Sequence, residues 1–104
     1  MEMVVRRGEH KVQGGKLIRV LLEEDRGRIA RIRITGDFFL HPEDAIFEME
    51  RALEGAELAE GPLLGRVKEV YRSTGALSIG AGPEDFVKAI LGAKAWSPAI
   101  SGPQ

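Results

Sequence analysis

The sequence predicts an α+β fold: a three-stranded antiparallel sheet with about three helices packed on one face. Two observations support this class. The first third of the chain is rich in β-branched and aliphatic residues interrupted by glycine-containing turns, whereas apolar residues recur at helical spacing in the remainder. Strand-forming and helix-forming segments are therefore separated along the chain, which is typical of α+β proteins.

Length and composition indicate one ordinary globular domain. The chain has 104 residues, of which 43% are hydrophobic and 30% charged, and its formal charge is −1. So small a net charge gives no overall field that would attract nucleic acid or an anionic membrane. There is no cysteine, which excludes disulfides, thiolate nucleophiles and cysteine-ligated metals. Without a secretory signal or a long apolar run, the protein is expected in the cytoplasm.

Three segments are predicted to be strands: residues 3–12, 16–24 and 28–35. The first meets the second through a Gln-Gly-Gly turn, and it is expected to pair with it as the third antiparallel strand of the sheet. Between the other two lies a three-residue loop, residues 25–27, whose last position favours a left-handed glycine. Gly27 fits that position.

The expected register of the second and third strands places Glu24 opposite Arg28. One face of the pair is then apolar and must be covered, with Ile18, Val20 and Leu22 opposite Ile34, Ile32 and Ala30. The other face places Arg19 opposite Arg33, with Arg31 nearby, so a basic face results. Glu9 on the first strand could lie beside Arg19 and reduce the repulsion.

Three amphipathic helices follow. The first runs from Pro42 until Gly55 stops it, and two short helices begin behind Pro62 and Pro83. From Lys94 the proline, glycine and serine content cannot continue a helix. The domain is therefore expected to cover residues 1–93, followed by an extended or mobile tail, residues 94–104, with Trp96 as its anchor.

No residue pattern indicates catalysis or metal binding. The histidines, His10 and His41, have no nucleophile motif near them, and metal-ligand spacings are missing. The Gly14-Gly15-Lys16 sequence is either a tight turn between strands or a turn from which Lys16 reaches a ligand held by a partner. The basic face lacks interleaved aromatic residues, so a solvated face or a protein-docking face is expected rather than an RNA-binding one.

The Gly-Asp-Phe-Phe sequence at residues 36–39 is predicted to form a corner. Gly36 allows a sharp change of direction, and the carboxylate of Asp37 can accept hydrogen bonds from backbone amides in the turn. Adjacent residues on an extended backbone point in opposite directions, so one of Phe38 and Phe39 should enter the core while the other faces outward. An outward ring would suit an interface, although packing of both rings remains open.

Residues 14–55, from Gly-Gly-Lys through the hairpin and Gly-Asp-Phe-Phe to the glycine that ends the first helix, resemble the small C-terminal domain of lipoate–protein ligases. The resemblance covers about two fifths of the chain. It implies an α+β fold similar to that of iron–sulfur scaffold proteins of the SufE/NifU kind. The matching motif residues are Gly14, Gly15, Lys16, Gly36, Asp37, Phe38 and Phe39, for which the resemblance implies roles in shape and docking.

The family's large catalytic domain is not part of this sequence, so the chain resembles the small polypeptide of a two-polypeptide ligase. The resemblance implies that lipoate and ATP with magnesium are bound by the large subunit, and that both chains are required to form lipoyl-AMP. It implies no catalytic residue and no cofactor in this chain alone. The expected partners are the large subunit and, indirectly, lipoyl carriers such as 2-oxoacid dehydrogenase lipoyl domains and the glycine-cleavage H protein.

Two other functions stay open at this point. A free-standing adaptor or scaffold could bind a different protein through the basic face of Arg19, Arg31 and Arg33. An independent small enzyme would need a reactive site, and the sequence displays none.

Overall fold

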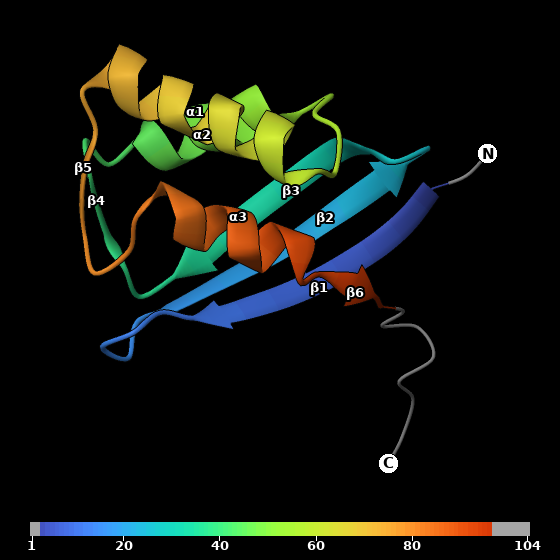
Figure 1. The fold of residues 1–104 in the computed structure, drawn as a ribbon, viewed down its shortest axis with the longest axis horizontal. Helices are drawn as coiled ribbons and strands as arrows, with labels where there is room; N and C mark the ends of the chain where they lie inside the picture. Colours follow the sequence, from blue (N-terminus) through green and yellow to red (C-terminus); the bar gives the residue numbers. More distant parts are fainter. Residues whose placement is uncertain (1–2, 97–104) are drawn as a thin grey trace.

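The computed structural model describes residues 3–96 and has an α+β architecture (Figure 1). Strands β1 (Met3–Lys11), β2 (Leu17–Asp25) and β3 (Arg28–Gly36) form an antiparallel meander. Helices α1 (Ala45–Leu53), α2 (Glu60–Thr74) and α3 (Pro83–Leu91) lie on one side of it. The pairing of the first segment with the second and the one-sided placement of the helices are therefore confirmed.

The sheet has four strands, so the prediction of three is wrong. Strand β6 (Lys94–Ala95) pairs with β1 and gives the order β3-β2-β1-β6. A second, two-stranded sheet consists of β4 (Phe39–His41) and β5 (Leu77–Ile79). These added strands have two or three residues, too few for an alternating pattern to be read from sequence. The tail thus begins as strand β6, and residues 97–104 lie outside the described part.

The core lies between the sheet and the helices. Its fully buried side chains come from both layers, and the largest are Phe86, Ile18, Leu22, Ile29, Met49, Leu53, Leu63 and Ile90. Burial of these apolar side chains is the main stabilising contribution to such a domain. Gly8 of β1 allows α3 to pack closely, since a Cβ atom there would lie 2.6 Å from the carbonyl oxygen of Ala89.

The register of β2 and β3 differs from the predicted one. Leu22 lies opposite Ile32 and Val20 opposite Ile34, whereas Arg19 lies opposite Thr35. The predicted Arg19–Arg33 pair is therefore wrong. The shift is by two residues, so each side chain keeps its predicted face, except near the hairpin loop.

The loop explains this shift. Only Arg26 and Gly27 separate the paired residues Asp25 and Arg28, and both loop residues have positive φ, 56° and 80°. This is the geometry of a two-residue hairpin with primed turn twist, and the left-handed Gly27 is confirmed. The register then shifts between Glu23 and Glu24 of β2, because Ala30 is an extra, bulged residue on β3. The bulge leaves Ala30 exposed, and Ile29 is buried instead.

The helices agree with the predicted apolar stripes but differ at their ends. Helix α1 begins at Ala45, because Pro42 is in the preceding turn, where its carbonyl accepts the N–H of Ala45. Helix α2 has 15 residues and is longer than predicted. Within residues 3–96, no helix has the length and apolar character needed to cross a bilayer.

Candidate partner-docking site

The corner at residues 36–37 is held against the start of β2. Asp37 Oδ1 accepts the backbone N–H of Leu17 at 2.6 Å, and the N–H of Asp37 donates to the carbonyl of Leu17 at 3.2 Å. Gly36 has φ +155°, and a Cβ atom there would lie 2.2 Å from the Leu17 carbonyl oxygen. The corner therefore requires glycine at position 36, and the carboxylate of Asp37 has a structural role in fixing the turn.

The two adjacent phenylalanines point in different directions, as predicted. The Phe38 ring packs edge-on against buried Phe86, with 5.1 Å between ring centroids. Phe39 is 52% exposed, and its ring lies parallel to that of His41 at 6.5 Å. Phe38 thus belongs to the edge of the core, whereas Phe39 is available to a partner.

The Gly-Gly-Lys sequence forms the β1–β2 turn. Gly14 and Gly15 have φ values of +100° and +98°, and the N–H of Val12 donates to the carbonyl of Lys16 at 2.7 Å. The Gly-Gly-Lys sequence thus forms a tight turn between the two strands. The aliphatic stem of Lys16 lies over Gly80, where a Cβ atom would be 2.8 Å from Lys16 Cγ. The turn after β5 thus meets the Gly-Gly-Lys turn.

The β4–β5 pair projects from the end of the molecule opposite β6 (Figure 1). Phe39 lies opposite Ile79, and His41 opposite Leu77, so these four side chains share one face. All four are exposed. We call Phe39, His41, Leu77 and Ile79 the ribbon patch.

The inner face of the β4–β5 pair is anchored. Leu40 is buried, and the Tyr71 hydroxyl donates to Ser78 Oγ at 2.9 Å. Ser78 in turn donates to the carbonyl of Ala81 at 2.6 Å. Burial raises the pKa of the Tyr71 hydroxyl above its usual 10.0, which further favours the protonated form that donates this hydrogen bond. The ribbon patch is therefore held facing outward.

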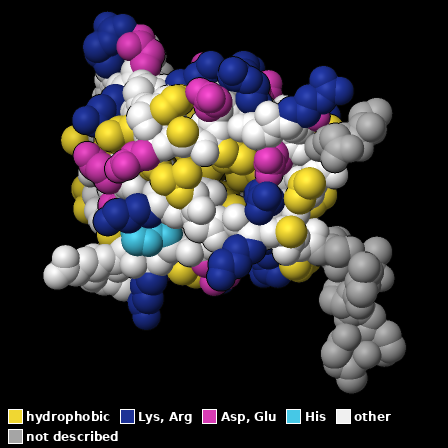
Figure 2. Space-filling model, turned by 45° about the vertical axis from the view of Figure 1, so that its right-hand side comes forward, with side chains coloured by type: hydrophobic (Ala, Val, Ile, Leu, Met, Phe, Trp, Pro, Cys, Tyr) yellow, Lys and Arg dark blue, Asp and Glu magenta, His cyan; other side chains and the backbone are white. Residues whose placement is uncertain are grey.

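The outer face of the main sheet carries the three predicted arginines, all exposed. Arg19 donates to Glu9 Oε2 at 3.1 Å, as the sequence suggests. In the observed register Arg31 lies opposite Glu23, and Arg33 lies opposite Leu21. The face is therefore mixed in charge rather than uniformly basic. Positive and negative side chains are likewise interspersed over the face seen in Figure 2.

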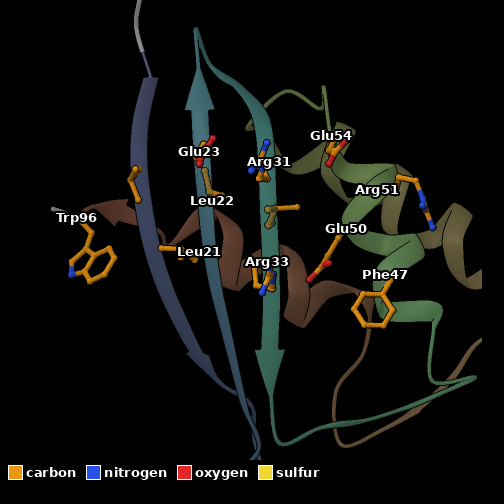
Figure 3. Close-up of a pocket in the computed structure, with 12 residues that line it drawn as sticks. Leu21, Leu22, Glu23, Arg31, Arg33, Phe47, Glu50, Arg51, Glu54 and Trp96 are labelled. Carbon is orange, nitrogen blue, oxygen red and sulfur yellow. The ribbon is translucent and has the colours of Figure 1, made fainter. Parts of the chain in front are cut away.

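A hollow of about 660 Å³ runs across this outer face to α1 (Figure 3). Trp96, whose backbone N–H donates to Val5 at 2.9 Å, stands at one end, and Phe47 of α1 stands at the other. The guanidinium of Arg7 lies 5.1 Å from the centre of the Trp96 ring. Trp96 is thus held against β1 by its backbone hydrogen bond and by Arg7. Glu50 closes part of the sheet edge by accepting the Ile34 N–H at 2.7 Å.

The remaining polar contact of interest joins β1 to α3. His10 Nε2 lies 3.0 Å from Asp85 Oδ1, and Asp85 Oδ2 accepts the Gly82 N–H at 2.8 Å. Burial alone would raise the pKa of Asp85, but these hydrogen bonds and the charges of His10 and Lys88 outweigh it and lower the pKa. Asp85 is the third residue of α3, and it stabilises the start of this helix by accepting the backbone N–H of the N-cap residue Gly82.

Comparisons with known proteins give a match by sequence and a match by structure. No protein-family model matches the chain. Lipoate-protein ligase A subunit 2 of Thermoplasma acidophilum is 38% identical over 74 residues, which are 71% of this chain and 76% of the relative. The chain belongs to the lipoate–protein ligase A subunit 2 family. The family-level resemblance seen in residues 14–55 is thereby confirmed.

A solved structure extends the likeness to the fold. It is that of an archaeal lipoylation system from Thermoplasma acidophilum, comprising a bi-partite lipoate protein ligase and its E2 lipoyl domain. One of its chains is similar to this family member with a TM-score of 0.75 and 34% identity, over 86% of this chain and 97% of that one.

The structure brings together some of the motif residues and separates others. The Gly-Gly-Lys turn, the corner and the ribbon patch are linked through Leu17 and Gly80. Arg19, Arg31 and Arg33 lie apart from them, on the outer sheet face. Leu77, Ile79 and Gly80 were not found by sequence reasoning. The alternation in Leu-Ser-Ile before a glycine is a signal for them, but three residues cannot establish a period.

Proposed function

We propose that this chain is the accessory subunit of a two-polypeptide lipoate–protein ligase. With the large catalytic subunit, it is required for the ATP-dependent activation of lipoate to lipoyl-AMP in protein lipoylation. The observation that carries this proposal is the 38% identity over three quarters of a ligase subunit 2. Because the relatives are ligase subunits, a free-standing adaptor is not favoured.

In this proposal the chain supplies no reactive group. Lipoate, ATP and magnesium are bound by the large subunit, and the lipoyl group passes to carriers such as lipoyl domains and the H protein. The small subunit acts by population shift: it binds the adenylation-competent arrangement of the large subunit more tightly and so increases its share. The proposal includes a cytoplasmic location and a fold related to that of the iron–sulfur scaffold proteins.

The Gly-Gly-Lys turn and the corner are proposed to dock the large subunit, with Lys16 directed toward the adenylation site. Support comes from the exposed position of Lys16 beside Gly80 and from the outward Phe39 ring. An ammonium group could stabilise the negative charge of an adenylate intermediate or of the departing pyrophosphate. Exposed Lys68 on α2 offers a matched control for Lys16.

Reconstitution tests the proposal. Purified large subunit, lipoate, ATP and magnesium are mixed with and without this chain, and lipoyl-AMP is measured by mass spectrometry. Product should form only when both chains are present, and the chain alone should form none. Equal rates with and without the chain would exclude an accessory role. If Lys16→Ala and Lys68→Ala were equally active, the role of Lys16 would be excluded while the subunit assignment survived.

A further inference from the structure

The ribbon patch is an exposed apolar surface that the fold itself does not cover. Phe39, Leu77 and Ile79 are 52%, 62% and 63% exposed. The cross-strand pairs Phe39–Ile79 and His41–Leu77 place all four patch residues side by side. Scattered apolar residues are normal on a protein surface, but a contiguous group on one element is typical of an interaction site.

The patch cannot turn inward to bury these side chains. Leu40 and Ser78 occupy the opposite face of the same two strands, where Leu40 is buried and Ser78 is hydrogen-bonded to Tyr71 and Ala81. Because side chains alternate across a strand, burial of Leu40 requires exposure of its neighbours. Exposure of the patch is thus a consequence of the strand pairing rather than of loose packing.

Lys16 places a positive charge at the rim of the patch. The stem of Lys16 passes over Gly80, immediately after β5, and among residues 3–96 its ammonium group takes part in no ion pair or hydrogen bond. The patch residues include a histidine and no carboxylate. A complementary surface is therefore apolar at its centre and carries an anionic group opposite Lys16.

We propose that the large ligase subunit docks on the ribbon patch through an apolar surface, with Lys16 at the rim directed toward the anionic adenylation site. This inference rests on the proposed function and specifies where the partner binds. A stable interface buries about 800 Å² on each partner, more than four residues of a short two-stranded ribbon can provide. The adjoining Gly14–Gly15 turn, the Asp37 corner and Lys16 form the rest of the contact. The ribbon patch is its apolar centre.

The experiment compares apolar residues that are equally exposed but lie in different places. Leu77→Ser/Ile79→Ser and, separately, Phe39→Ser remove apolar area from the patch. Phe47→Ser is the matched control, because Phe47 is 59% exposed on α1 and lines the outer hollow instead. The affinity of each variant for purified large subunit is measured by titration calorimetry, and folding is checked by circular dichroism and thermal unfolding.

Phe39→Ser should bind the large subunit at least about 10-fold more weakly than wild type, as expected for a central interface residue. The double variant Leu77→Ser/Ile79→Ser should bind about 100-fold more weakly. Phe47→Ser should change the affinity less than about 3-fold. Lys16→Glu should also weaken binding, with normal folding. Because Phe39 lies on a different strand from Leu77 and Ile79, a folding defect in one variant does not prevent the test with the other.

Two results would overturn the inference. One is unchanged affinity of folded patch variants while lipoyl-AMP formation still depends on this chain, because the partner would then bind elsewhere. The other is a patch-dependent dimer of this chain, seen by sedimentation, with unchanged affinity for the large subunit. Failure of the proposed function would give a different result, because the large subunit would then form lipoyl-AMP at full rate without this chain.

Discussion

The ribbon patch and the outer face of the main sheet are both exposed, but their side chains differ in kind. Several charged side chains of the outer face have partners within the chain, whereas the patch exposes apolar surface to water. On the outer face Arg19 is paired with Glu9, and Arg7 lies over Trp96. On the ribbon patch Phe39, Leu77 and Ile79 have more than half of their surface in water. Exposure alone does not identify an interface, whereas a contiguous apolar surface left in water indicates one.

The difference has an energetic basis. Exposed ion pairs contribute about 0–1 kcal/mol and are stable in water, so the charged side chains of the outer face gain little from a partner. Each large apolar side chain gains about 1.5–3 kcal/mol when it is fully removed from water. A partner that covers the patch therefore gains more from apolar burial than one that covers the arginines of the outer face.

The largest effect is expected at Gly36, where β3 ends and the corner toward the ribbon begins. Gly36→Ala would force its Cβ to within 2.2 Å of the Leu17 carbonyl oxygen, so the backbone must move. The free energy of unfolding, measured by urea denaturation, should fall by about 2–4 kcal/mol. Gly65→Ala is the control. Gly65 lies in α2 with open space around it, and alanine there should stabilise the protein by about 0.5–1 kcal/mol.

The neighbouring phenylalanines separate the contribution to folding from the contribution to docking. Phe38→Ala removes the edge-on contact with Phe86 and should lower the free energy of unfolding by about 2 kcal/mol. Phe39→Ala should lower it by less than about 0.5 kcal/mol, because that ring is half exposed. Affinity for the large subunit should show the reverse order. Equal losses of stability would contradict the assignment of one ring to each role.

A smaller effect is expected at Asp85, which joins α3 to β1 through His10. Its pKa in the folded protein is below its usual 3.8, so the unfolded state takes up a proton more readily. The stabilisation from the ionised carboxylate is therefore complete above about pH 5 and is lost as the pH falls below 3.8. Asp85→Asn should lower stability at pH 7 by about 1 kcal/mol and flatten the acid limb of a stability–pH profile. An unchanged acid limb would contradict this assignment.

The smallest effect is expected on the outer face. Among residues 3–96, neither Arg31 nor Arg33 forms an ion pair within the chain. Arg31→Glu/Arg33→Glu should change the free energy of unfolding by no more than about 0.5 kcal/mol. Affinity for the large subunit, measured in the same buffer as the patch variants, should change less than about 3-fold. A 100-fold loss would move the docking surface to the outer face.

The sequence predicts the main elements because they are long enough to show a period. The nine-residue strands alternate clearly enough to identify Ile18, Val20 and Leu22 as core residues. The predicted register failed near Ala30, because the turn chemistry of Arg26 and Gly27 shortens the loop and a bulge compensates. Propensity alone does not reveal a bulge.

The candidate site could be predicted only in part. The Gly-Asp-Phe-Phe sequence indicates a corner, and the opposite directions of its rings follow from strand geometry. The ribbon patch could not be predicted, because Phe39 and Ile79 are 40 residues apart in the chain and meet through two three-residue strands. Such a contact is determined by tertiary packing around Leu40 and Ser78, which local sequence patterns do not encode.

The most direct test of the docking surface is an amide chemical-shift map of isotope-labelled chain titrated with unlabelled large subunit. Signals of residues 36–41 and 77–80, together with the Gly14–Gly15 turn, should shift or broaden most. Signals of the central outer face, residues 19–23 and 31–33, should change least. The opposite pattern, with the largest changes on the outer face and none in the ribbon, would contradict the account.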